Sequence, residues 1–423
     1  MPTIRALSAL EILDSRGRPT VKAYCELEGG ARATASVPSG ASTGRAEAYE
    51  LRDNDPARYG GLGCRRAVAN VKTEIAEALT GRTFTDQREL DAALAALDGT
   101  ANKSRLGANA LLAVSIAFAR AHAAELELPL YRHFADLVGR PLRTLPRLTI
   151  NLFSGGKHAG GQVAIQDVLI VPVAARTVDE GLAAAYAVYQ AAVGLSAERY
   201  HARALTADEG GLAPPFEGVE AMLETAVAAI ERGGLAPGRD IALAVDVASS
   251  HFYRAGRYEL DGAELSAEQM IARIAQWVAR YPIISVEDGL AEDDWAHWPT
   301  LRDALTEDAL TLGDDLLCTN PERIERAVAA RAADALLLKV NQIGTLSEAA
   351  RSYALARDAG WRVTVSARSG ETEDHWLADL AVGWGGDQIK VGSITRSERL
   401  AKYNRLLEIE HETGLPVTTW PND

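Results

Sequence analysis

The chain has few of the features that mark disulfide-stabilised, nucleic-acid-binding or membrane proteins. Only 3 of its 423 residues are cysteines, and Cys25, Cys64 and Cys318 lack the spacing of a disulfide framework or a metal motif, which indicates reduced thiols. Basic residues (44) are fewer than acidic residues (58), and the resulting net charge of −14 argues against nucleic acid or an anionic membrane as the main partner.

Targeting and membrane-spanning signals are also scarce. The first ten residues, MPTIRALSAL, lack a charged segment followed by an apolar run, so no signal peptide is expected. The longest apolar-looking stretch, residues 110–119, is interrupted by Ser115 and is too short to span a bilayer. We therefore expect a cytoplasmic protein without a membrane partner. Because the chain is acidic, binding an anionic substrate requires lysine, arginine or a metal ion in the site.

Length and hydrophobic patterning predict two domains. A chain of this length exceeds one typical core, and a hydrophobic content of 47% is ample for folding. Residues 3–37 alternate in the manner of strands, whereas residues 63–138 have helical patterns and are followed by a linker with two prolines. We predict an α+β domain over residues 1–140 and a barrel over residues 141–423.

Three loops and one strand contain candidate functional residues before the main repeat. The Gly/Ser-rich stretch 38–44 is either a solvated linker or a mobile lid over a ligand. The stretch GGKHAGG lacks the terminal Lys-Ser/Thr of a phosphate loop but contains His158, a residue type that is more often structural than catalytic when it stands alone. Gln166 and Asp167 are expected on the strand VAIQDVLI, and Glu209 lies on a Gly-rich loop.

The stretch from residue 241 to residue 392 contains six short apolar runs, each ending in polar residues and each separated from the next by a segment that can hold a helix. This is the pattern of repeated βα units, which form a parallel sheet or barrel with the strand ends on one face. Polar residues at the C-terminal ends of barrel strands usually take part in chemistry. The residues at these ends are Asp246, Glu287, Asp314, Lys339, Arg368 with Ser369, and Lys390.

Three of these strand ends carry carboxylates. Asp246, Glu287 and Asp314 would repel one another in a shared cavity and raise one another's pKa values. A hard divalent cation relieves this repulsion, and ligation by oxygen alone suits Mg²⁺. The alternative is that each acid is an independent surface residue, which equivalent placement at three strand ends disfavours.

The remaining strand ends are cationic. Lys339 and Lys390 either balance the acids or supply a general base, since a lysine beside a divalent cation has a depressed pKa. The Arg368 guanidinium can donate two parallel hydrogen bonds to a phosphate or carboxylate group, and the Ser369 hydroxyl can add another. With Glu209 as an acid, this set suits removal of a proton α to a carboxylate, with the resulting enediolate stabilised by Mg²⁺.

At this point the chain resembles the enolase family along nearly its whole length, and a base with Mg²⁺-stabilised enediolate is that superfamily's known strategy. The matching stretches are DSRGRPTV, VPSGASTG, KSRLGANALLAVS, GGKHAGG, DEGGLAP, DVASS, SVEDGL, GDDL, LLLKVNQIGTL, RSGETED, DQIKVGS and RSERLAKYN. The resemblance implies an α/β fold with an N-terminal α+β capping domain, followed by an enolase-type (β/α)8 TIM-like barrel that opens ββαα. It also implies two Mg²⁺ ions and a homodimer.

The resemblance also implies roles for individual residues. Asp246, Glu287 and Asp314 correspond to the ligands of the first Mg²⁺, and Ser42 in the loop corresponds to the protein ligand of the second. The roles implied for the others are base for Lys339, acid for Glu209, partner of the substrate carboxylate for Lys390, phosphate contacts for Arg368 and Ser369, and proximity to the substrate for His158.

Several positions depart from the family pattern. Ala367 stands where enolases have an active-site histidine, and Gln166 is followed by Asp167 where they have glutamate. That carboxylate works beside the acid in the family and is one methylene shorter here. Ala207 and Pro215 replace the family's glycine and asparagine near Glu209. The departures lie on the leaving-group and phosphate side, whereas the metal ligands and both lysines match.

A further departure is a paired one. Many enolases have glutamate after PTV and arginine in the last helix, and these meet across the dimer interface. Here the two positions are Lys22 and Glu408, so the charges are exchanged and attraction is retained. We predict a Lys22–Glu408 pair between subunits.

Three functions remain open. The first is a paralogue that eliminates water from an ester with an extra group on phosphorus, for which replacement of histidine by Ala367 makes room; carboxyphosphonoenolpyruvate synthase of phosphonate antibiotic biosynthesis is a family relative of this kind. The second is an ordinary glycolytic enolase that converts 2-phosphoglycerate to phosphoenolpyruvate. The third is a non-catalytic, enolase-like binding protein, which the intact acids and lysines argue against.

Overall fold

The chain begins with an antiparallel sheet whose strands alternate buried and exposed residues. The computed structural model describes residues 1–41, 43–305 and 308–421. The sheet has the order β1-β2-β3, formed by β1 (Ile4–Leu13), β2 (Pro19–Leu27) and β3 (Arg32–Ser36). Tight turns join the strands, and Gly17 and Gly30 there have φ angles of 72° and 90°, a conformation that glycine adopts without steric cost.

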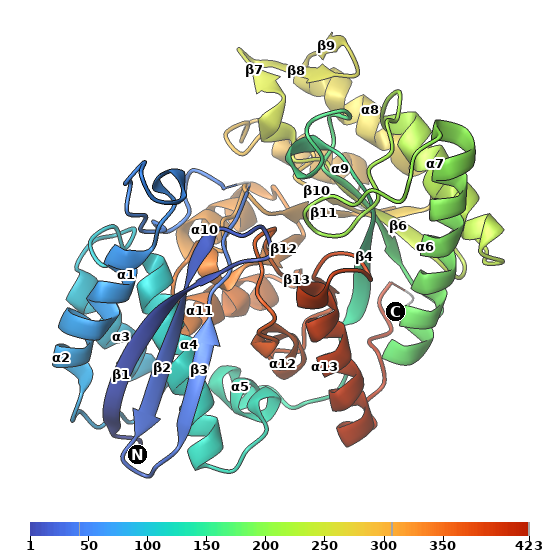
Figure 1. Ribbon diagram of the computed structural model, residues 1–423. Coiled ribbons are helices and arrows are strands. Elements are labelled where there is room, and N and C mark those ends of the chain that lie inside the picture. Colours follow the sequence, from blue (N-terminus) through green and yellow to red (C-terminus); the bar gives the residue numbers. More distant parts are fainter. Residues whose placement is uncertain (42, 306–307, 422–423) are drawn as a thin grey trace.

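Five helices follow (Figure 1). They are α1 (Arg65–Asn70), α2 (Ala76–Leu79), α3 (Gln87–Asp98), α4 (Ala108–Glu125) and α5 (Leu130–Val138). Helices α1, α2 and α4 contact the sheet, and α3 and α5 pack against α4. A π-helical turn, Val71–Ile75, joins α1 to α2 where one amphipathic helix is expected from the sequence. Helix α4 contacts β2 and β3, and its apolar residues are buried almost all round, as the Ala-rich pattern predicts.

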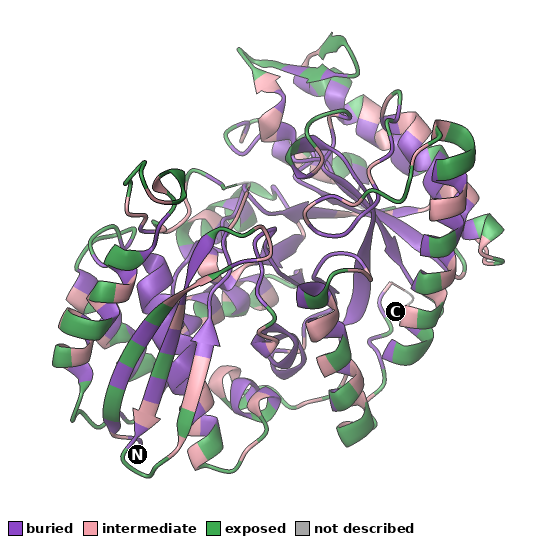
Figure 2. Cartoon of the chain, viewed as in Figure 1, coloured by how far each residue is buried: buried purple, intermediate pink, exposed green. Residues whose placement is uncertain are grey.

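The second part of the chain forms a closed eight-stranded barrel. Its strands are β4 (Arg147–Ser154), β5 (Asp167–Val171), β6 (Ala242–Asp246), β10 (Ile283–Glu287), β11 (Leu310–Gly313), β12 (Ala335–Leu338), β13 (Arg362–Ser366) and β14 (Gln388–Lys390). Strand β5 runs antiparallel to both of its neighbours, and the other neighbouring pairs are parallel. Barrel strands are buried at almost every residue, in contrast to the N-terminal sheet (Figure 2).

Helices surround the barrel. They are α6 (Val178–Tyr200), α7 (Val219–Arg232), α8 (Ala267–Arg280), α9 (Trp298–Leu305), α10 (Pro321–Ala330), α11 (Leu346–Asp358), α12 (Trp376–Gly383) and α13 (Ser397–Thr413). A small sheet of β7 (Tyr253–Arg254), β8 (Arg257–Leu260) and β9 (Ala263–Leu265) lies before α8. The order β4-β5-α6-α7 gives the ββαα opening, so the expected capping domain and enolase-type barrel are confirmed. Among the described helices, none is both long and apolar enough to cross a membrane.

The N-terminal part packs against the barrel on two sides. Helix α5 contacts α12, and α3 contacts α11. Near the expected lid, the Ser39 and Gly370 backbones exchange hydrogen bonds of 2.8 and 2.9 Å, which place this stretch against the loop after β13.

Candidate active site

The C-terminal ends of the parallel strands and the first residue of β5 meet at one mouth of the barrel. Because β5 runs antiparallel, its first residue, Asp167, lies beside Asp246 at the end of β6, and Asp246 is also paired in register with Glu287. Ser366 lies beside Lys390 in the same way. The predicted strand was expected to include Gln166, but β5 begins one residue later, at Asp167. The backbone N–H of Gln166 still donates a hydrogen bond to the Asp246 carbonyl oxygen.

A small cavity at this mouth brings together most of the residues predicted from the sequence. It is lined by Ala41, His158, Gln166, Glu209, Asp246, Lys339, Ser366, Ala367, Arg368, Ser369 and Lys390. Asp167, Glu287 and Asp314 contact these lining residues from behind. Ser42 lies outside the described residues. The cavity has a volume of ≈ 20 Å³, about enough for one water, so a substrate enters only if partners separate.

The lysines neutralise the carboxylates directly. Lys390 Nζ lies 2.8 Å from Asp246 Oδ2 and 2.6 Å from Glu287 Oε2, and Lys339 Nζ lies 2.5 Å from Asp314 Oδ2. Burial favours the neutral forms, but these carboxylates outweigh it and raise the pKa values of both lysines. This direction is opposite to the depressed lysine pKa expected beside a cation, because here each lysine's nearest neighbours are anions.

The carboxylates respond differently to this environment. Burial and the neighbouring charges of Asp246 and Asp314 raise the pKa of Glu287 well above its usual range, as mutual repulsion predicts. Burial also acts on Asp246, but Lys390 lowers its pKa overall, so the expectation of raised values does not hold there.

These acids fit a divalent cation. Glu287 Oε1 is buried, and among the described residues no hydrogen-bond partner reaches it; the same is true of Gln166 Oε1. Buried oxygens without partners and a carboxylate with a raised pKa are features that an oxygen-preferring cation would satisfy. Two groups of described residues have ligand atoms close enough together to hold an ion: Asp288 with Asp314 and Asp315, and His158 with Asp167 and Glu209. Of the three predicted ligands, only Asp314 belongs to one of these groups.

Three further titratable residues at the barrel mouth form a chain. Asp167 Oδ2 lies 2.9 Å from His158 Nδ1, and His158 Nε2 lies 3.8 Å from Glu209 Oε1. Ser154 Oγ donates to Asp167 Oδ1 at 2.5 Å, so each of the two carboxylate oxygens of Asp167 has a hydrogen-bond partner. Burial disfavours the imidazolium, but Asp167 and Glu209 raise the pKa of His158 to about 9. For Glu209, burial acts to raise the pKa of the carboxyl group, yet the positive charges of His158 and Arg399 lower it overall.

The expected phosphate contacts are occupied by other parts of the chain. Arg368 donates from Nη1 and Nη2 to the Glu47 carboxylate at 3.0 and 3.1 Å, and from Nη1 to Asn341 Oδ1 at 3.0 Å. Ser369 Oγ accepts hydrogen bonds from the Ala41 backbone N–H at 2.7 Å and from Arg16 Nη1 at 3.1 Å. Both residues face the cavity.

Sequence reasoning did not identify Glu47 or Arg16 as site residues. Arg16 lies in the quoted stretch DSRGRPTV, so a signal for it was present in the motif, whereas Glu47 lies three residues beyond the end of VPSGASTG. Arg16 is held by Asp14, whose carboxylate it contacts at 3.0 Å.

The loop after β13 is held by a side chain of α13. Arg399, fully buried, donates to the carbonyl oxygens of Arg368 and Ser369 at 2.6 Å each. Ala367 lies in this loop, 5% exposed, and its backbone N–H bonds to the Lys390 carbonyl at 2.9 Å. Ala367 lines the cavity at the position where the resemblance implies a histidine.

Comparison with protein-family models covers both parts of the chain. Residues 4–134 match the model described as "Enolase, N-terminal domain", and residues 142–419 match "Enolase, C-terminal TIM barrel domain". Together the two matches take in nearly all of the chain, including the barrel mouth.

Proposed function

The chain belongs to the enolase family, and we propose that it is a Mg²⁺-dependent lyase that removes water from an ester resembling 2-phosphoglycerate to give an enolpyruvyl product. One observation carries this proposal: two lysines and three carboxylates converge at one barrel mouth, together with His158 and Glu209. Such a site can remove a proton on one side of a small substrate and supply one on the other.

Asp246, Glu287 and Asp314 are the residues that would hold Mg²⁺, which would stabilise negative charge developing on the substrate carboxylate. A second ion, with Ser42 as a protein ligand, is part of the proposal. The orphaned Glu287 Oε1 and the raised pKa of Glu287 support the choice of ligands.

Lys339 is the proposed base. A base must be neutral before it takes a proton, and Asp314 now favours the protonated form of Lys339. Binding of other positive charge to Asp314 weakens that preference and prepares Lys339 for its role. Lys390, between Asp246 and Glu287, is placed to contact the substrate carboxylate.

The chain Asp167–His158–Glu209 is the proposed route for the proton that the leaving hydroxyl needs. With a pKa of about 9, His158 carries a proton at neutral pH, whereas the lowered pKa of Glu209 keeps that carboxylate ionised, so the proton passes from His158 through Glu209 to the hydroxyl as it leaves as water. Asp167 holds His158 in orientation through Nδ1 and keeps it charged. Gln166 lines the same side of the cavity.

Ala367 supports an ester with an additional group on phosphorus, as in carboxyphosphonoenolpyruvate formation for phosphonate antibiotic biosynthesis. This residue lines the cavity next to Arg368, so the volume of the missing ring falls beside the proposed phosphorus contacts. The intact lysines and acids favour a second candidate, conversion of 2-phosphoglycerate to phosphoenolpyruvate. A site that only binds the ester is distinguished from both by its lack of turnover.

The test is a comparison of the two esters with Mg²⁺, following absorbance of the enol product, in the wild-type protein and in Ala367→His. We expect the wild type to prefer the larger ester, and Ala367→His to lose activity on it while gaining activity on 2-phosphoglycerate. Preference of the wild type for 2-phosphoglycerate would assign the glycolytic reaction. Absence of product from either ester would contradict the proposed lyase.

A further inference from the structure

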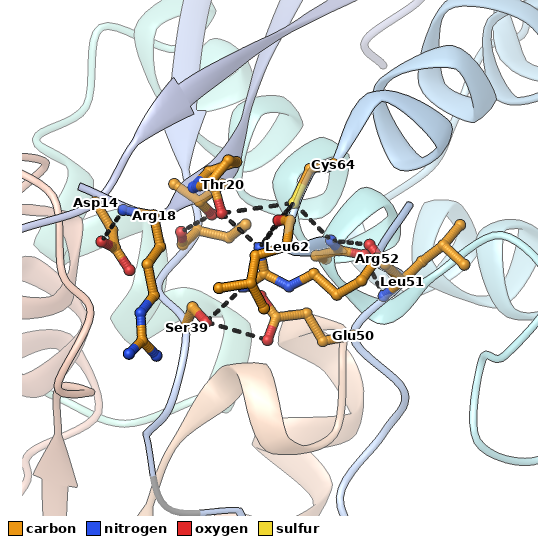
Figure 3. Close-up of polar contacts among 12 residues, drawn as sticks. Asp14, Arg18, Thr20, Ser39, Glu50, Leu51, Arg52, Leu62 and Cys64 are labelled. Carbon is orange, nitrogen blue, oxygen red and sulfur yellow. Dashed lines mark hydrogen bonds and ion pairs between the residues drawn. The ribbon is translucent and has the colours of Figure 1, made fainter. Parts of the chain in front are cut away.

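The described residues from Ser39 to Glu50, which leave out Ser42, belong to a loop whose two ends are tied together. Ser39 Oγ donates to Glu50 Oε2 at 3.1 Å, and Arg52 Nη2 donates to Ser39 Oγ at 2.8 Å and to Glu50 Oε1 at 2.6 Å (Figure 3). Arg52 is itself fixed to the N-terminal part through the Pro19 carbonyl. Compact surface loops whose ends lie close together are frequently functional.

Glu47 makes the buried ion pair between this segment and the barrel. The side chains of Glu47 and Arg368 are 8% and 3% exposed, and the carboxylate meets both terminal nitrogens of the guanidinium. Arg45 also reaches the barrel, pairing with Asp293 at 2.6 Å, but these side chains are 79% and 52% exposed. Exposed pairs contribute little, whereas breaking a buried pair leaves an uncompensated charge.

The same carboxylate connects the segment to the metal-ligand side of the cavity. Glu47 Oε1 accepts from the Gly44 backbone N–H at 3.0 Å and from Gln342 Nε2 at 3.5 Å. Gln342 Nε2 also donates to Asp314 Oδ1 at 2.8 Å. Glu47 therefore links the backbone of the segment, Arg368 and the partner of Asp314.

We infer that Glu47 is a positioning residue that fixes the Arg368 guanidinium for an anionic ester and at the same time holds the 39–50 segment over the cavity. A bidentate carboxylate sets the plane of the guanidinium, which a neutral amide does not do with equal strength. Docking of the segment and binding of the ester are thereby coupled through one arginine. The inference has two halves: the role of Glu47 in ester binding, which rests on the proposed function, and its role in docking the 39–50 segment, which does not.

The docking half is tested by limited trypsin digestion of the whole protein. Trypsin cuts after Arg45, whose side chain is exposed, and cleavage of a locally opening segment follows the population of the open form. Glu47→Gln is expected to increase the rate of cleavage after Arg45 by about tenfold, which corresponds to about 1.4 kcal/mol. Glu47→Asp keeps the charge and is expected to fall between Glu47→Gln and the wild type.

Glu26→Gln is the matched control, because Glu26 pairs with Arg5 and Arg32 on the N-terminal sheet, away from the segment. It is expected to leave cleavage after Arg45 unchanged. Equal cleavage rates after Arg45 in Glu47→Gln and wild type would overturn the docking role. A uniform increase at all tryptic sites would also overturn it, since that pattern means general unfolding.

The ester-binding half is tested with 2-phosphoglycerate and Mg²⁺. We expect the ester to protect wild-type Arg45 from trypsin, and Glu47→Gln to lose this protection and to show a KM raised by about tenfold with a smaller change in kcat. A lower KM in Glu47→Gln would mean that Glu47 competes with the ester, which would overturn the positioning role. If 2-phosphoglycerate neither protects the wild type nor reacts with it, the ester-binding role is overturned for this ester. The proposed function is then decided by the comparison of the two esters, and the docking role by the cleavage rates without ester.

Discussion

At the scale of single residues, the site is a set of charges that hold one another in place. Lys339 and Lys390 occupy the middle of the acids, and His158 lies between two acids of its own. Each of these lysines and the histidine contacts at least one carboxylate, which offsets the cost of burying the charge. Function then depends on exchanging these internal partners for substrate and metal.

Lys339→Ala is expected to abolish exchange of the substrate α-proton with solvent, whichever ester is used. General bases contribute about 10²–10⁴-fold to rate, and with Lys339 removed the described structure offers no other amine at this strand end. The measurement is loss of the C2 proton signal in D2O by NMR. Lys72→Ala, an exposed lysine on the N-terminal part, is the control and is expected to retain exchange. Exchange at the wild-type rate in Lys339→Ala would exclude Lys339 as the base.

His158 is expected to titrate far above an ordinary histidine. Its pKa of about 9 exceeds the usual value of about 6.5 in the unfolded chain, so its protonation stabilises the fold fully below pH 6.5. That contribution is lost as the pH rises through about 9.

NMR titration of the imidazole measures this pKa directly, with His158→Gln identifying the signal. Asp167→Asn is expected to lower the pKa by about 1–3 units, because a contacting opposite charge is removed. Asp179→Asn, at an exposed position on α6, is the control. An unchanged pKa in Asp167→Asn would mean that Asp167 does not hold the proton on His158.

At the scale of elements, strand ends were predictable from the sequence and loop contacts were not. The apolar run IALAVD places Asp246 at a strand end because the polar residue follows a continuous buried stretch. The Glu47–Arg368 pair joins residues 321 positions apart, and Glu47 lies in a loop without periodicity. Such a contact depends on how two domains pack, which local patterns do not encode.

The start of β5 shows a second limit of the sequence. Alternation and composition predict a strand through Gln166, but they do not show that it runs antiparallel or that it begins at Asp167. That direction is what brings Asp167 to the mouth of the barrel. The resemblance implied a ββαα opening without giving the strand's direction, and the apolar pattern alone is compatible with a parallel strand.

Helix α13 is expected to control the phosphate side through Arg399. Arg399→Met removes two charge-assisted hydrogen bonds to the Arg368 and Ser369 carbonyls, each worth about 1.5–3 kcal/mol, while keeping an apolar stem. We expect KM to rise by about tenfold and the free energy of unfolding to fall by about 3 kcal/mol, measured by kinetics and urea denaturation.

Lys402→Met is the matched control for this variant. Lys402 is equally buried on α13 but contacts Glu371 and the carbonyls of Thr372 and Glu398. It is expected to lose similar stability with a smaller change in KM. Equal changes in KM for the two variants would mean that Arg399 acts only through stability.

At the scale of the whole molecule, an acidic protein concentrates its positive charge where an anion must bind. The net charge is −14, yet Lys339, Lys390 and Arg368 all reach one small cavity. The N-terminal part supplies Arg16 and Glu47 to the same place, so neither domain forms the site alone.

The predicted dimer remains a proposal at this scale. Within the chain, Glu408 lies 2.9 Å from Arg405 and its side chain is 62% exposed, while Lys22 is half-buried on β2. If Lys22 and Glu408 meet across a two-fold axis, two pairs form, each worth at most about 1 kcal/mol. Lys22→Glu is expected to weaken the dimer by about tenfold, and Lys22→Glu with Glu408→Lys to restore it, in sedimentation equilibrium. Equal weakening by the double variant would show that the residues do not meet.

The most direct test of the central claim is exchange of the C2 proton of 2-phosphoglycerate in D2O, followed by NMR with increasing Mg²⁺. The account predicts that the wild-type protein loses the C2 proton signal in a Mg²⁺-dependent manner, even if product forms slowly because the preferred ester is larger. A wild-type protein that leaves the C2 proton in place at every Mg²⁺ concentration, and gives no product, would contradict the proposed base and metal site.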